Sequence, residues 1–144
     1  MKPGARHRAR EAALQMLYQW ELGGGELDAS LDTYLELHAS PDLIAAPPLA
    51  AFATSLVRGV VTHGPEIDAL IAEQAEHWRL ARMAVTDRII LRLAVYEFLH
   101  AGDTPRPVVI DEAVELAKTF SGDEAGGFVN GVLDGIRRRL DSRP

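Results

Sequence analysis

Apolar residues recur at spacings of three and four along most of this chain, which is the period of one face of an α-helix. The first clear case is Met16, Leu17 and Trp20, in a segment from about residue 8 to residue 22. The strongest apolar segment covers residues 85–99, and its apolar positions occupy more than one helix face. We therefore expect residues 85–99 to form a helix at the centre of the fold.

Glycine and proline separate the periodic segments. Residues 23–25 are three glycines that end the first helix, and Pro41 breaks the second. Residues 43–46, followed by Pro47 and another proline, form a candidate linker. Helices are expected at about residues 8–22, 27–35, 49–60, 65–78, 85–99, 107–120 and 124–140. About seven helices and no convincing strand predict an all-α protein, either one antiparallel bundle or two bundles packed together.

Charge is distributed unevenly. The first ten residues hold four cations and no acid, namely Lys2, Arg6, Arg8 and Arg10, whereas residues 11–57 hold seven acids and no Lys or Arg. The net charge of −6 argues against a general nucleic-acid-binding protein. A few clustered cations can nevertheless hold a polyphosphate backbone locally.

The basic segment has two interpretations. If a helix begins near Pro3, then Arg6, His7 and Arg10 lie within one turn of each other and form a cationic edge, with Tyr18 further along a similar side. Cations beside an exposed aromatic ring are what single-stranded RNA requires, because unpaired bases stack on aromatic side chains. Charged termini are also often merely solvated, and composition alone leaves both interpretations open.

Phe128 is ambiguous in the same way. An aromatic at helical spacing usually belongs to the core, but Gly126 and Gly127 precede it. The ring could therefore lie at the surface near a helix N-terminus, which attracts phosphate.

Catalysis and metal binding have no sequence support. The chain has no cysteine, its five histidines show no ligand-pair spacing, and no glycine-rich phosphate loop or nucleophile elbow is present. Acids at 111–112 and 123–124 are better explained by helix first turns, where the dipole favours them. No apolar run approaches the roughly 20 residues that span a bilayer, and no export signal is evident. We expect a cytoplasmic protein without cofactors or a membrane partner.

Four segments resemble the NusB family of transcription antitermination factors. Residues 6–20 (RHRAREAALQMLYQW) resemble its arginine-rich first helix, and residues 87–97 (DRIILRLAVYE) resemble its central helix. Residues 107–118 (PVVIDEAVELAK) and 128–134 (FVNGVLD) resemble its C-terminal signature. The blocks occur in the family's order and span nearly the whole chain.

This resemblance implies two small packed helical subdomains, at about residues 1–80 and 81–144, and no catalysis. It implies binding to the boxA element of ribosomal RNA transcripts together with NusE, a small-subunit ribosomal protein. That assembly joins RNA polymerase and other Nus factors, and supports processive transcription of rRNA operons. The resemblance assigns RNA binding to Lys2, Arg6, His7, Arg10, Tyr18, Glu124 and Phe128. It places Asp87, Arg88 and Arg92 on the helix that faces NusE.

Two positions depart from the family pattern. His7 stands where the family often has Arg, which makes that cation partial near neutral pH. Gly126 and Gly127 stand where some members carry polar or basic residues. Both departures predict a weaker RNA site and greater reliance on NusE. Gly131, which belongs to the signature, is interpreted as a position of close helix packing.

Two alternatives remain. A NusB-like domain also occurs ahead of rRNA methyltransferases, but a chain ending at Pro144, without a glycine-rich fingerprint, is expected to lack a cofactor-binding domain. The other alternative is a structural helical adaptor without specific RNA binding. The sequence does not distinguish a monomer from a homodimer.

Overall fold

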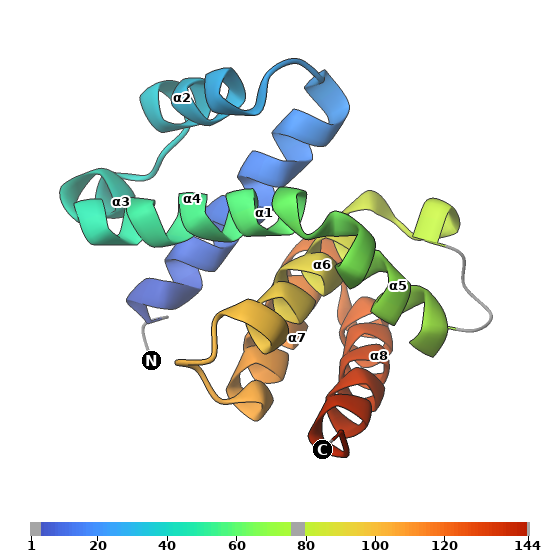
Figure 1. Ribbon diagram of the computed structural model, residues 1–144. Helices are drawn as coiled ribbons and strands as arrows, with labels where there is room; N and C mark the ends of the chain where they lie inside the picture. The colour runs from blue at the N-terminus through green and yellow to red at the C-terminus, as the bar shows by residue number, and fades with distance from the viewer. Residues whose placement is uncertain (1–3, 76–79, 144) are drawn as a thin grey trace. The chain divides into compact units, whose positions relative to one another are not determined.

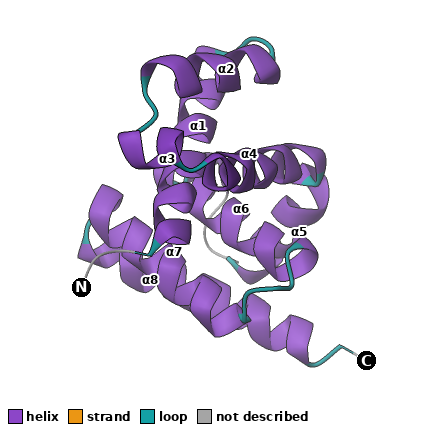
Figure 2. Ribbon diagram, turned by 90° about the vertical axis from the view of Figure 1, so that its left-hand side faces the viewer, coloured by secondary structure: helices purple, strands orange, loops and turns teal. Residues whose placement is uncertain are grey.

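The computed structural model describes residues 4–75 and 80–143, and every regular element in those ranges is helical (Figures 1 and 2). The α-helices are α1 (Ala5–Gly23), α2 (Leu27–Leu37), α3 (Pro41–Ala45), α4 (Pro47–Thr62), α5 (Gly64–Gln74), α6 (Val85–His100), α7 (Arg106–Ser121) and α8 (Asp123–Asp141), with a 3-10 turn, η1 (Leu80–Arg82), before α6. The predicted all-α class is confirmed. The segment from 41 to 45, which the pattern assigned partly to a linker, is a helix of its own.

The chain divides into two compact units, one up to Arg58 and one from Gly59 onward. The division falls inside α4, and not near residue 80 as the sequence pattern indicated. The physical reason is that α5 packs against α6 and α8, so residues 64–74 belong to the C-terminal unit.

In the N-terminal unit, α1 packs against α2 through a face of small and medium apolar side chains. Met16 and Leu17 are buried on α1, and Leu31 and Tyr34 are buried on α2. Two side-chain hydrogen bonds fix the pairing: the Tyr34 hydroxyl donates to Gln15 Oε1 at 2.6 Å, and the Gln19 amide donates to the Ser30 carbonyl oxygen at 3.3 Å.

Helix α3 forms because its first turn is capped and its one large apolar residue is covered. The Leu43 N–H donates to the Ser40 hydroxyl at 3.3 Å, and Pro41 occupies the first turn, where its missing N–H costs nothing. Leu43 is 2 % exposed. The expected linker at 43–46 is therefore wrong: a capped short helix is too brief to show a period, and its prolines look like breakers.

In the C-terminal unit, α6 is the central helix, as its apolar pattern predicted. It packs against α5, α7 and α8, and its buried residues cover several faces: Ile89, Ile90, Leu91, Leu93, Ala94, Val95 and Phe98. Gly59 permits one close approach, since a Cβ there would lie 2.1 Å from the Tyr96 ring. Gly122, with φ at 105°, makes the sharp turn between α7 and α8 that only glycine adopts readily.

Helix α8 packs closely at a glycine other than the one expected. Gly131 is exposed, and a Cβ added to it would meet nothing within 4 Å, so the packing role predicted for it is wrong. Four residues later, a Cβ on Gly135 would lie 2.1 Å from the Gln74 amide of α5. Gly135 is therefore the glycine at which α8 approaches a neighbouring helix.

Candidate nucleic-acid interface

The cationic edge predicted on α1 exists, and it lies over an aromatic ring. The Arg6 guanidinium carbon is 4.5 Å from the centre of the Phe52 ring of α4, and that of Arg10 is 5.6 Å from it. A cation over an aromatic face is attracted by the ring's negative charge density. Phe52 therefore holds two arginines in place. The sequence analysis missed it, because one aromatic in an apolar helix gives no signal that distinguishes a platform from a core residue.

The members of this edge are not equivalent. Arg6 is exposed, whereas Arg10 is 5 % exposed and contributes mainly as a packed cation. His7 is turned toward an acid, with Nε2 3.0 Å from Glu11 Oε1 and its side chain 12 % exposed. Lys2 lies outside the described residues. Of the predicted α1 cations that the structure describes, Arg6 is the one that presents its charge to solvent.

Arg8 belongs to the same basic segment but has a different role. Its Nε lies 3.3 Å from Asp42 Oδ2, next to α3, so its charge is compensated within the N-terminal unit. Tyr18, the predicted stacking ring, is 43 % exposed. It lies eight residues beyond Arg10 on α1, which corresponds to about 12 Å along the axis. The exposed pair on this helix is thus one cation and one aromatic ring.

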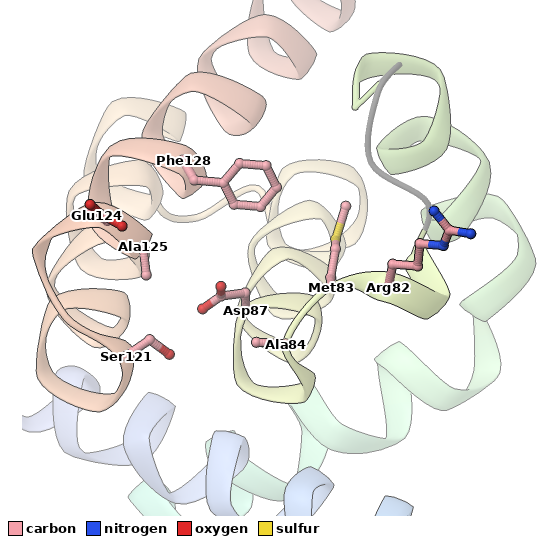
Figure 3. Close-up of a pocket in the computed structure, with 8 residues that line it drawn as sticks. All are labelled: Arg82, Met83, Ala84, Asp87, Ser121, Glu124, Ala125 and Phe128. Atoms are coloured by element: carbon pink, nitrogen blue, oxygen red, sulfur yellow. The ribbon is translucent and has the colours of Figure 1, made fainter.

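A pocket in the C-terminal unit brings together predicted residues from distant parts of the sequence (Figure 3). It has a volume of about 390 Å³ and lies between η1, the start of α6, the end of α7 and the start of α8. Its lining residues are Arg82, Met83, Ala84, Asp87, Ser121, Glu124, Ala125 and Phe128. Figure 3 shows the Phe128 ring directed toward Met83. The pocket therefore unites a residue predicted to bind a partner, Asp87, with two predicted to bind RNA.

The pocket is acidic and contains a buried acceptor. Asp87 Oδ1 is buried and has no hydrogen-bond partner among the residues that the structure describes. Asp87 and Glu124 occupy the first turns of α6 and α8, where the helix dipoles favour a negative charge. A buried acceptor without a donor is costly, so the site is suited to an incoming N–H group or cation. Phosphate is disfavoured beside these two carboxylates, and the exposed edge of the pocket suits a base edge or a basic side chain better.

The two arginines that follow Asp87 on α6 are engaged within their own unit. Arg92 Nε and Nη2 donate to the two Asp68 oxygens of α5 at 2.8 and 3.0 Å, which is a bidentate pair. Arg88 Nη1 donates to the Leu80 carbonyl oxygen of η1 at 3.2 Å. Both arginines are partly buried. They fix the elements on either side of the pocket: α5 through Arg92 and η1 through Arg88.

These features are typical of an all-helical module that binds nucleic acid or a protein partner. Within the described ranges, no helix combines the length and apolar character needed to cross a membrane.

The comparisons with known proteins identify the family. The NusB family model matches residues 7–138, and this chain therefore belongs to the NusB family. It is 46 % identical over 136 residues to the transcription antitermination protein NusB of Solibacter usitatus, covering 94 % of this chain and 90 % of that protein.

Solved structures agree. A NusB structure from T. maritima matches with a TM-score of 0.80 at 37 % identity, covering 96 % of this chain and 93 % of that chain. A crystal structure of antitermination factors NusB and NusE in complex with double-stranded RNA matches with a TM-score of 0.82 at 29 % identity, covering 94 % and 97 %.

Proposed function

We propose that this protein is a transcription antitermination factor that binds boxA RNA of ribosomal RNA transcripts together with NusE. In this role it acts without catalysis, in the cytoplasm, as part of an RNA polymerase complex with other Nus factors. The observation that carries the proposal is the family match over residues 7–138. A solved relative that contains NusB, NusE and RNA supports the choice of partners.

The proposed RNA contacts differ in kind between the two units. On α1, Arg6 contacts phosphate and Tyr18 offers a stacking face, because both side chains are exposed. Arg10 and His7 support this edge, the first through Phe52 and the second beside Glu11. Lys2 stays a prediction of the same kind. In the C-terminal unit, Phe128 and Glu124 contact bases, since an exposed acid accepts N–H groups and repels phosphate.

The proposed NusE contact centres on Asp87. Its buried oxygen lacks a donor within the described parts of the chain, and a basic or N–H group of the partner would supply one. Arg88 and Arg92 act as positioning residues, because their side chains are spent on η1 and α5. A partner bound at Asp87 would lie beside Phe128, so RNA and protein binding would be coupled at this pocket.

The alternative of an RNA-binding domain related to rRNA methyltransferases is weaker. This chain covers 90 % of the length of its Solibacter usitatus relative, which is named as an antitermination protein. The structural-adaptor alternative predicts no preference among RNA sequences, and the following experiment separates it from the proposal.

The test is a gel shift with boxA RNA and a scrambled RNA of equal length, each with and without NusE. The proposal predicts binding of boxA over the scrambled RNA, strengthened by NusE. Equal retention of both RNAs in both conditions would contradict it.

A second test uses Asp87→Lys, with Glu115→Lys as a control. Glu115 is an exposed acid on α7, so the two variants make the same change in net charge. Asp87→Lys should abolish the enhancement by NusE, because a cation replaces the acceptor, while Glu115→Lys should retain it. Wild-type enhancement with Asp87→Lys would remove Asp87 from the interface.

A further inference from the structure

Two imidazoles and one carboxylate meet where α5 begins and α6 ends. His63 is the N-cap residue of α5, Glu66 lies in its first turn, and His100 is the last residue of α6. His100 Nε2 is 3.3 Å from Glu66 Oε1, and His63 Nδ1 is 3.9 Å from Glu66 Oε2. One possible ligand atom from each residue lies within 4.8 Å of the other two. All three residues belong to the C-terminal unit.

Packing holds the two imidazoles together. Their rings are stacked, with centres 3.9 Å apart and planes inclined by 23°. The Tyr96 ring lies behind both, 6.0 Å from His63 and 5.6 Å from His100. Tyr96 in turn fits into the space that Gly59 leaves. The side chains of His63, Glu66 and His100 are 35 %, 51 % and 30 % exposed, so the group is preformed and accessible from solvent.

The donor set fits a divalent transition-metal ion. Imidazole nitrogen and carboxylate oxygen are the ligands of open zinc sites, with bonds of about 2.0–2.2 Å that separate tetrahedral ligand atoms by roughly 3.3–3.5 Å. The His100–Glu66 separation already meets that spacing, and the His63–Glu66 separation exceeds it by a few tenths of an ångström. The nearly parallel rings must rotate for their lone pairs to converge, and the Cβ–Cγ torsion of histidine is broad enough to permit this.

We propose that His63, Glu66 and His100 bind a Zn²⁺-class ion and leave the remaining coordination positions to water. The sequence predicts no metal site, because its histidines lack ligand-pair spacing. Here His100 comes from a different helix and joins the other two residues only in the folded unit. An ion pair between Glu66 and His100 would account for one contact, but not for a second imidazole stacked beside the same carboxylate.

Metal binding at this position would tie the first turn of α5 to the last turn of α6. The Asp68–Arg92 pair joins the same two helices nearer their middles. Because the ligand atoms come together only in the folded state, an ion bound there stabilises that state by mass action. The inference is independent of RNA binding and can hold or fail without it.

The experiment uses the full chain without an affinity tag, stripped of metal. Zn²⁺ binding is measured by calorimetry, and Co²⁺ serves as a spectroscopic probe because its visible absorption reports the ligand geometry. The variants are His100→Gln and Glu66→Gln. The control is His38→Gln, an exposed histidine of the other unit. Thermal unfolding in a chelator establishes that each variant is folded.

The proposal predicts one Zn²⁺ per chain, a higher unfolding temperature with Zn²⁺ and a Co²⁺ band in the wild type and in His38→Gln. Loss of even an outer hydrogen-bond partner of a metal ligand costs about 10- to 100-fold in affinity, so loss of a direct ligand should cost at least about 100-fold. Wild-type Zn²⁺ affinity in folded His100→Gln and Glu66→Gln would overturn the proposal. Absence of any saturable Zn²⁺ binding by the wild type would overturn it equally.

Discussion

The bidentate pair between Arg92 and Asp68 allows a structural role to be separated from a partner-binding one. The substitutions are Arg92→Met, Asp68→Asn and the double variant. Exposed ion pairs contribute about 0.2–1 kcal/mol, and hydrogen bonds to charged groups contribute about 1.5–3 kcal/mol when shielded. The side chains are 23 % and 33 % exposed, and the donor–acceptor distances are 2.8 and 3.0 Å. We therefore expect a coupling free energy between those ranges, about 1–2 kcal/mol.

The assay is urea unfolding of all four proteins, arranged as a double-mutant cycle, which isolates the pair from the other contacts of each side chain. A coupling below about 0.3 kcal/mol would refute the reasoning, since that is the scale of additivity for independent sites. NusE binding is then measured where every variant is folded. If Arg92 acts by positioning α6, then Arg92→Met and Asp68→Asn weaken binding alike. If only Arg92→Met weakens it, Arg92 touches the partner directly.

Three further predictions concern packing, the arginine platform and pH. Gly59→Ala should lower the free energy of unfolding by up to about 2 kcal/mol, because overpacking against Tyr96 costs about 1–3 kcal/mol and helix propensity returns about 1; the open site Gly131→Ala should raise it by up to about 1 kcal/mol, and equal effects in urea unfolding would contradict the packing. Phe52→Leu should weaken boxA binding about 2- to 5-fold by fluorescence anisotropy, since an exposed cation–π contact contributes about 0.5–1 kcal/mol, and unchanged affinity would count against the platform. Burial, and then the charge of Glu11, raise the pKa of Tyr34 above 10.0, so its contribution to stability is complete below pH 10.0 and is lost as the pH rises through the folded-state pKa; Tyr34→Phe should remove this decline in unfolding measurements at alkaline pH.

The all-α class and the central position of α6 could be predicted from sequence because apolar periodicity reports which faces are buried. The same pattern placed the unit boundary near residue 80, since it cannot tell which helices pack together. Helix α5 joins α6 and α8 through tertiary packing, which a period does not contain. Helix α3 was missed because a capped turn of five residues is shorter than the pattern needs.

The candidate site was predictable in its residue types and less so in their arrangement. The spacing of Arg6 and Arg10 correctly predicted one edge of α1, but not that Arg10 would be buried over Phe52. Asp87 and Phe128 were singled out for different partners, and the fold places them in one pocket. His63, Glu66 and His100 have no shared spacing, so only the folded unit reveals their association.

The central claim is that the α1 edge binds RNA through the exposed charge of Arg6. It is tested most directly by titrating boxA binding with salt for the wild type, Arg6→Ala and Arg8→Ala. Arg8 is the matched control, because it lies on the same helix with the same charge but is paired with Asp42. Each phosphate contact contributes about 0.7 to the slope of log affinity against log salt for single strands. The account predicts weaker binding and a slope reduced by about 0.7 for Arg6→Ala, with little change for Arg8→Ala. Equal affinities and slopes for Arg6→Ala and the wild type would contradict it.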